Sequence, residues 1–184
     1  MEYNDAHKIY VTSDTHFGHT KTITQFIFRP FTSAEEMDKK MVENWNDIVK
    51  PKDTVIHLGD FSFQNPQNYV SRLNGQIHII PGNHDRLPRL KRAGFACIRD
   101  AIWHFKFIHG DEKKEVVLCH YPMLSWNKKR YGVPHLYGHM HTGSKERENN
   151  LLFQKGSYDV GVDNNDYKPL DILEAIKKCT DVIS

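Results

Sequence analysis

The chain lacks the features that would assign it to a membrane, secreted or cysteine-rich class. Its cysteines, Cys97, Cys119 and Cys179, are odd in number, widely spaced and without a CxxC pair. Neither a disulfide framework nor a cysteine zinc site is therefore expected. No apolar run approaches the ~20 residues that cross a bilayer, and the polar segment 1–8 does not resemble a signal peptide. We expect a soluble, cytoplasmic protein with no membrane partner.

Charge of one sign is not in excess either. The formal net charge of +2 over 184 residues is too small to imply a polyanion-binding surface, so no stable nucleic-acid partner is expected. Hydrophobic residues make up 39% and charged residues 26%, which are ordinary values for a globular chain. This length fits a single domain, 1–184, with enough apolar surface for a core. Histidine is the outlier, with 12 copies.

The spacing of apolar residues predicts alternating strands and helices. Ser33 and Glu36 have capping-box spacing at the start of a helix that Pro51 ends. Shorter helices are expected at 66–73, 86–93 and 170–179, and a hairpin at 102–108 and 114–119. Further strands are expected at 9–13, 53–58, 76–80, 135–137, 151–153 and 158–162. This order predicts an α/β layered fold with mixed sheets.

Five short polar clusters follow the expected strands. In order they are Asp14-Thr15-His16, Gly59-Asp60, Gly82-Asn83-His84-Asp85, His120 and Gly138-His139-Met140-His141. Carboxylates, an amide oxygen and imidazoles form the mixed oxygen and nitrogen ligand set that borderline divalent metals prefer. Each cluster alone is weak evidence, but the ordered set predicts a two-metal catalytic site.

The position of the clusters explains how residues so distant in sequence could meet. Ligand sites of open α/β sheets form outside the carboxyl ends of the strands, where several loops converge. In an extended backbone, residues i and i+2 point to the same side, so both members of each Asp-x-His or His-x-His pair can face one site. Gly59, Gly82 and Gly138 precede expected ligands, and glycine permits positive φ and close backbone approach.

In this order, the five motifs resemble those of the calcineurin-like metallophosphoesterase superfamily. The resemblance spans Asp14 to His141 with no core motif missing. The compact spacing leaves no large insertion for a cap domain, as in the small bacterial, archaeal and phage members. The resemblance implies a four-layer α/β/β/α sandwich with a dinuclear metal site at one sheet edge.

The resemblance also implies a role for each matching residue. It assigns the first metal to Asp14, His16 and His141, the second to Asn83, His120 and His139, and the bridging position to Asp60. His84 would lie beside the site without binding a metal, and Asp85 would orient it.

Elementary charge and proton chemistry favours the same roles. Two divalent ions with Asp14, Asp60 and a bridging hydroxide would leave a charge of about +1, which favours a phosphate group. The hydroxide would attack phosphorus in line, and protonated His84 would act as general acid toward the leaving oxygen. Mn²⁺ is the first expectation, with Fe, Zn²⁺ or Ni²⁺ as alternatives, because one site of this type accepts several ions.

Other residues carry weaker evidence for a role. His19 and Arg29 lie in the loop after Asp14; both are candidate substrate contacts, since arginine binds phosphate with two-pronged geometry. His57 fits a core position or one behind the ligands. The segment 126–131 mixes bases with aromatic residues and fits an exposed basic loop better than a nucleobase site.

The sequence leaves several functions open. The leading hypothesis is an enzyme acting on a small phosphate ester, with a nucleotide as one candidate. Phosphodiesters are favoured because small uncapped relatives commonly cleave diesters. A phosphomonoesterase (a nucleotide or protein phosphatase), a weak nuclease and a non-catalytic metal-binding scaffold are the alternatives.

Overall fold

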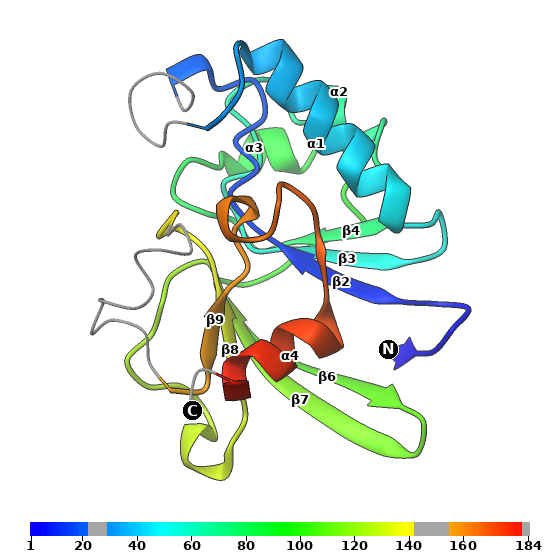
Figure 1. Cartoon of the computed structure of the whole chain (residues 1–184), viewed down its shortest axis with the longest axis vertical. Coiled ribbons are helices and arrows are strands. Elements are labelled where there is room, and N and C mark those ends of the chain that lie inside the picture. Colours follow the sequence, from blue (N-terminus) through cyan, green and yellow to red (C-terminus); the bar gives the residue numbers. More distant parts are fainter. Residues whose placement is uncertain (22–28, 142–154, 182–184) are drawn as a thin grey trace.

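The computed structural model describes residues 1–21, 29–141 and 155–181, which form two mixed five-stranded sheets (Figure 1). The strands are β1 (Glu2–Tyr3), β2 (Ile9–Thr12), β3 (Thr54–His57), β4 (Gln76–Ile79), β5 (Cys97–Ile98), β6 (Ile102–His109), β7 (Glu112–Cys119), β8 (His135–Tyr137), β9 (Ser157–Asp159) and β10 (Leu170–Asp171). The helices are α1 (Ala34–Ile48), α2 (Gln67–Val70), α3 (Leu87–Leu90) and α4 (Ile172–Asp181). The predicted α/β fold with two mixed sheets is confirmed.

The first sheet has the strand order β10-β2-β3-β4-β5. Strands β2 to β5 run parallel, whereas β10 pairs antiparallel with β2 at the edge. Parallel neighbours need crossover connections, and α1, α2 and α3 lie in those connections along the chain. The carboxyl ends of β2, β3 and β4 therefore meet at one edge of the sheet.

The second sheet has the strand order β1-β6-β7-β8-β9. The hairpin β6–β7 pairs antiparallel along its whole length, from Ile102 opposite Cys119 to His109 opposite Glu112. Strands β7, β8 and β9 are parallel to one another. The carboxyl ends of β7 and β8 therefore lie at the same edge of the second sheet.

One core lies between α1 and the first sheet. Met37, Met41 and Trp45 recur on one face of α1 and are buried together with Val55 and Ile79 of the sheet. Figure 1 shows α1 above β4, β3 and β2, on the side of the first sheet that faces away from β6 and β7. Burying each such side chain stabilises the fold by about 1.5–3 kcal/mol, so the amphipathic spacing of this helix determines where it packs.

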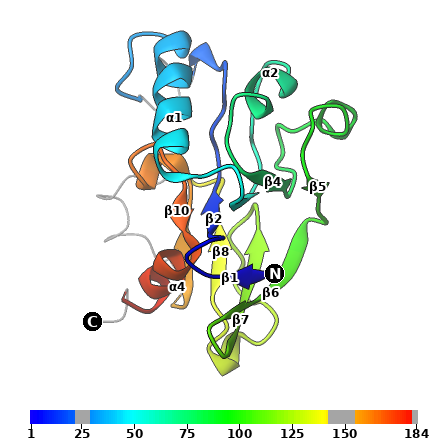
Figure 2. The ribbon, with the colours of Figure 1, turned by 90° about the vertical axis from the view of Figure 1, so that its right-hand side faces the viewer.

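A second core fills the space between the two sheets. It buries side chains of both sheets and of α4, among them Ile56, Leu118, Leu136, Ala175 and Cys179. Helix α4 packs against β2, β8, β9 and β10 and lies at the left of these strands in Figure 2. The two sheets are thus held face to face, with their site-bearing loops in fixed relative positions.

The structure differs from the predicted elements mainly where elements are short. Strands β1, β5 and β10 have two residues each and were not predicted, because two residues carry no periodic pattern. Helices α2 and α3 have four residues each, fewer than the predicted segments. The strand expected at 151–153 lies outside the described residues.

Two of the expectations drawn from composition concern membrane-spanning helices and cysteine pairing. No helix in the described parts of the chain is long and apolar enough to cross a membrane. All three cysteines are free, and Cys119 and Cys179 are buried.

Candidate metal centre

Loops from both sheets meet at one place in the molecule. Asp14 follows β2 and Asp60 follows β3, and the backbone amide of Asp14 donates to the carbonyl of Gly59 at 3.0 Å. On the second sheet His120 follows β7, and its carbonyl accepts the amide of Gly138 at 2.9 Å. The amide of His139 donates to Asp14 Oδ2 at 2.8 Å, which links the two sheets directly.

The first group of candidate ligands is Asp14, His16 and His141. One ligand atom of each lies within 4.8 Å of the others. The Nε2 atoms of His16 and His141 are 3.1 Å apart, and each lies 3.9 Å from Asp14 Oδ1. These are the three residues that the sequence assigns to the first metal.

The second group is Asp60, His120 and His139, whose ligand atoms also lie within 4.8 Å of one another. Asp60 Oδ2 is 3.6 Å from His120 Nε2 and 3.7 Å from His16 Nε2. Asp60 thus lies between the two groups. Asn83 Oδ1 is 3.0 Å from His120 Nε2, so the expected amide ligand also faces the second group.

The hydrogen bonds behind two of the imidazoles determine which ring nitrogen carries a lone pair. His120 Nδ1 is 2.7 Å from the carbonyl of Leu58, and His141 Nδ1 is 2.8 Å from Asp163 Oδ2. Because carbonyl and carboxylate oxygens only accept, Nδ1 donates in both rings and the neutral ring presents a lone pair at Nε2. In His120 this lone pair faces Asn83 Oδ1, a second acceptor. A cation bound by both atoms would resolve this pairing of two acceptors.

Asp14 provides a second test of whether the site fits a cation. Its side chain is fully buried, and its Oδ1 has no hydrogen-bond partner among the described residues. Burial raises the pKa of this carboxyl to about 8, although His141 acts in the opposite direction. Burying an unpaired carboxylate is costly, and metal coordination removes that cost. The residues present therefore fit two divalent ions of the oxygen/nitrogen-binding class.

Several candidate ligands adopt backbone conformations that non-glycine residues seldom adopt. The φ angles are 58° at Asp14, 49° at His16, 57° at Asp60, 72° at His139 and 48° at His141. Such left-handed conformations cost about 1–3 kcal/mol each and cluster at functional sites. The sharp turns allow each strand exit to aim its side chain at the centre.

Gly59 and Gly138, each before a candidate ligand, are required for different reasons. Gly59 has a φ of 100°, as expected, and a Cβ there would lie 2.5 Å from the amide nitrogen of Gly82. Gly138 does not have a positive φ, but a Cβ there would collide with Ser13 Oγ and Asp14 Oδ2. Close approach between loops, more than backbone freedom, accounts for glycine at 138.

His84 lies beside Asp60 without belonging to either ligand group. Its side chain is 49% exposed, and its Nε2 is 4.0 Å from Asp60 Oδ2. Its backbone amide donates to Asp60 Oδ1 at 2.9 Å. A substrate bound at the centre could therefore reach this imidazole from solvent.

Asp85 contacts backbone amides. Its carboxylate accepts from the amides of Asp60, Phe61 and Gly82 at 2.8–3.1 Å. Burial raises the pKa of Asp85 to about 6, and these bonds counteract the effect. Asp85 thus fixes the loop that carries His84. Asp85 is expected to orient His84, and it would do so through the backbone of this loop.

The expected substrate contact of Arg29 is corrected by the structure. Its side chain is 0% exposed and its Nε donates to Asp163 Oδ1 at 2.8 Å. The two terminal nitrogens donate to the carbonyls of Asp14 and Thr15 at 2.6 and 2.8 Å. The guanidinium is committed to the loop that carries the ligands, so it supports the site from inside the protein.

Asp163 follows the strand expected at 158–162, and the sequence gives only a weak indication that it supports the site from a neighbouring loop. It joins Arg29 to His141 (2.8 Å from Oδ2 to His141 Nδ1). Burial disfavours charge on both partners, yet their hydrogen bond holds the pKa of His141 above and that of Asp163 below the ordinary value. Its position in the polar segment after β9 resembles that of the other clusters, which was the available indication.

His19 and His57 occupy different positions around the centre. The ring of His19 stacks on Phe63 at a centroid distance of 3.6 Å and lies 5.7 Å from the ring of His16, which keeps it near the site. His57 is fully buried, with Nε2 3.0 Å from Thr15 Oγ1 and Nδ1 accepting from the amide of Gly59. His57 therefore connects the loop after β2 with the loop after β3.

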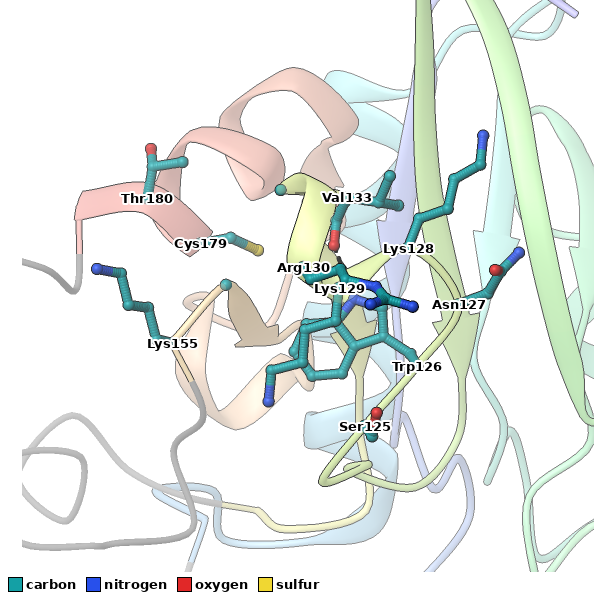
Figure 3. A pocket seen from close by; sticks show the side chains of 12 residues that line it. Ser125, Trp126, Asn127, Lys128, Lys129, Arg130, Val133, Lys155, Cys179 and Thr180 are labelled. Carbon is teal, nitrogen blue, oxygen red and sulfur yellow. Dashed lines mark hydrogen bonds between the residues drawn. The ribbon is translucent and has the colours of Figure 1, made fainter.

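Two cavities lie at different distances from these residues. One of about 360 Å³ is lined by Phe63, Asn83, His84 and neighbouring residues, so it adjoins the centre. Another of about 860 Å³ is lined by residues of the loop after β7 and by the end of α4. Figure 3 shows this second cavity with Trp126, whose Nε1 donates to the carbonyl of Val133 at 2.7 Å. It includes none of the candidate ligands.

Known proteins resemble this chain along most of its length. The family model of the calcineurin-like phosphoesterase superfamily domain matches residues 8–160. The uncharacterized protein MJ1445 of Methanocaldococcus jannaschii is 32% identical over 175 residues, covering 92% of this chain and 90% of the relative. The Gene 66 protein of Mycobacterium phage L5 is 25% identical over 162 residues, covering 72% and 77%.

A solved structure resembles the fold. The crystal structure of AQ665, a protein of unknown function from Aquifex aeolicus, superposes with a TM-score of 0.69 at 24% identity. The match covers 94% of this chain and 99% of that protein. At this identity the likeness concerns the fold alone.

Proposed function

Since the chain belongs to the calcineurin-like phosphoesterase superfamily, we propose that it hydrolyses phosphate esters with two divalent metal ions and prefers phosphodiesters. The observation that carries the proposal is the pair of His/Asp groups. Asp60 belongs to one group, and its Oδ2 lies within 3.7 Å of His16 in the other. A two-ion site of this kind activates water and neutralises charge on a phosphoryl group.

The protein residues have distinct tasks in the proposed reaction. Asp14, His16 and His141 would bind one ion, and Asn83, His120 and His139 the other. Asp60 would contact both. A water that has given one proton to solvent would add to phosphorus, the bond from phosphorus to the leaving oxygen would break, and that oxygen would take a proton. His84 would donate this proton, because it lies beside Asp60 and half of its side chain is exposed.

The openness of the site supports diesters over monoesters. Asn83 and His84 are both exposed, so a second ester group on the phosphate has room on this side. A diester also carries less negative charge than a monoester, which suits a centre whose own charge is only slightly positive. Among candidate ions we favour Mn²⁺, with Fe, Zn²⁺ and Ni²⁺ as alternatives.

The proposal is tested by hydrolysis of bis(4-nitrophenyl) phosphate and 4-nitrophenyl phosphate with each of these ions. We expect kcat/KM to be higher for the diester, activity to disappear with a chelator, and Asp60→Asn to be inactive. Asp111→Asn, in the exposed β6–β7 turn, is the control and should keep full activity. A higher kcat/KM for the monoester would replace the diesterase by a phosphatase, and metal-replete protein without activity would favour a scaffold.

A further inference from the structure

The 360 Å³ cavity beside His84 is lined in part by basic side chains. Its lining includes two arginines, Arg86 and Arg89, together with the aromatic ring of Phe63. The carboxylate in the lining, Asp85, accepts bonds from three backbone amides and makes no ion pair with either arginine among the described residues. The cavity therefore presents positive charge toward solvent.

Both arginines are available to a ligand. They are exposed, Arg86 at the N-cap of α3 and Arg89 within that helix, and both line the same cavity. Ion pairs of Lys and Arg in the described parts of the chain involve other basic residues. Two neighbouring guanidinium groups without carboxylate partners can bind a phosphate or carboxylate group in two-pronged geometry.

The position of His84 indicates which part of a substrate would enter this cavity. A general acid must lie next to the leaving oxygen, and His84 lines the cavity together with Asn83. The leaving group then extends from His84 toward the arginines. Phe63, 37% exposed, adds an aromatic ring to the lining, with its centroid 5.0 Å from that of His84.

We propose that this cavity binds the leaving group and selects leaving groups that carry an anionic group, either a phosphate or a carboxylate. The proposal rests on the proposed function, because it assumes that His84 protonates the leaving oxygen. Its substrate class is a phosphate ester with a second negative charge on the departing side. Arg86 and Arg89 are specificity residues in this scheme and take no part in bond breaking.

A matched pair of chromogenic diesters tests the proposal. The pair consists of bis(4-nitrophenyl) phosphate and its analogue with a carboxylate beside each nitro group, bis(3-carboxy-4-nitrophenyl) phosphate. We expect the wild-type protein to have a higher kcat/KM for the carboxylated ester. The double variant Arg86→Gln/Arg89→Gln should reduce the ratio of the two kcat/KM values about tenfold. Salt should reduce the wild-type ratio as well.

Arg92→Gln is the matched control, since Arg92 is exposed but does not line the cavity; it should keep the wild-type ratio. An equal ratio in wild type and double variant would overturn the proposal. If neither ester is cleaved, the proposed function fails instead. The cavity is then tested by titration with the leaving group itself, 5-hydroxy-2-nitrobenzoate. Tighter binding to wild type than to the double variant supports the cavity, and equal binding overturns it.

Discussion

Three side chains in the candidate metal centre, those of His120, His141 and Asp14, are held by a hydrogen-bond partner of their own. The carbonyl of Leu58 orients His120, Asp163 orients His141, and the amide of His139 binds Asp14. Partners of this kind fix the tautomer and ring orientation of metal ligands and contribute to metal affinity. The centre is therefore larger than its ligand set, and residues without a metal contact should influence binding.

Asp163→Asn tests this at a single residue. The substitution keeps the size of the side chain but removes the charge that orients His141 and binds Arg29. We expect the affinity for the first metal to fall about 10- to 100-fold, as measured by titration calorimetry with Mn²⁺. Asp166→Asn, whose carboxylate is 89% exposed, serves as the control. Equal affinities in the two variants would show that Asp163 does not support the ligand.

His84→Ala separates proton donation from metal binding. The variant should retain both ions, because His84 belongs to neither ligand group. We expect kcat to fall about 10²- to 10⁴-fold, with a larger loss for an ester whose leaving group is poorly activated. The measurement is kcat over a series of aryl diesters together with metal content. An unchanged kcat for the poorest leaving group would remove His84 from the mechanism.

Sequence reasoning at the residue scale succeeds where a motif is local and fails where a partner is distant. Asp14 and His16 are two positions apart in the sequence, and their ligand atoms lie in one group. The guanidinium of Arg29 instead hydrogen-bonds to Asp163, a residue 134 positions away in the sequence. No local pattern reveals that contact, so the arginine was expected to face a phosphate.

At the scale of one element, strand β8 contains a buried histidine outside the metal centre. His135 is 0% exposed. Its Nδ1 donates to the carbonyl of Val117 at 3.0 Å, and its Nε2 accepts the amide of Met123 at 3.3 Å. Both nitrogens of the neutral ring are therefore paired. Burial is the main reason that the pKa falls from 6.5 to about 4.

This depressed pKa predicts how stability changes with pH. Between pH 6.5 and about 4 the unfolded chain binds a proton at His135 that the folded chain excludes. The free energy of unfolding therefore falls as the pH falls through this range, by up to about 1.4 kcal/mol per pH unit from this residue.

Urea unfolding of chelator-treated protein at several pH values provides the measurement. His135→Gln should show a shallower pH slope than wild type. Leu136→Val, in the same strand and core, should lower stability at every pH while keeping the wild-type slope. Identical slopes for wild type and His135→Gln would contradict this account of the strand.

Elements with a long periodic pattern were predictable, and those defined by pairing were not. The spacing of apolar residues along α1 and the capping Ser33 locate that helix within two residues of its observed ends. Strand β10 instead owes its existence to antiparallel pairing of Leu170 with Val11. Such pairing depends on the assembled sheet and cannot be inferred from two residues alone.

At the scale of the whole molecule, the candidate metal centre joins the two sheets. Its candidate ligands come from loops after β2, β3 and β4 of one sheet and after β7 and β8 of the other. The motifs and the sheet-edge rule predicted this gathering from sequence. The register and the packing of one sheet on the other depend on the whole core, which a local pattern does not specify.

Metal removal should therefore destabilise the whole fold. An ion that binds the folded chain alone stabilises it by about 2.7 kcal/mol for each site at 100 times its Kd. We expect Mn²⁺ to raise the denaturation midpoint relative to chelator-treated protein, and Asp14→Asn to lose a large part of that increase. The exposed-site control Asp111→Asn should respond as wild type does. A midpoint that is independent of metal would mean that no ion couples to folding.

A crystal of the Mn²⁺-loaded protein, measured at the manganese absorption edge, tests the central claim most directly. The account predicts two anomalous peaks about 3.5–4 Å apart. The carboxylate of Asp60 should contact both peaks, with His16 and His141 at one and His120 and His139 at the other. A single peak, or two peaks that Asp60 does not share, would contradict it.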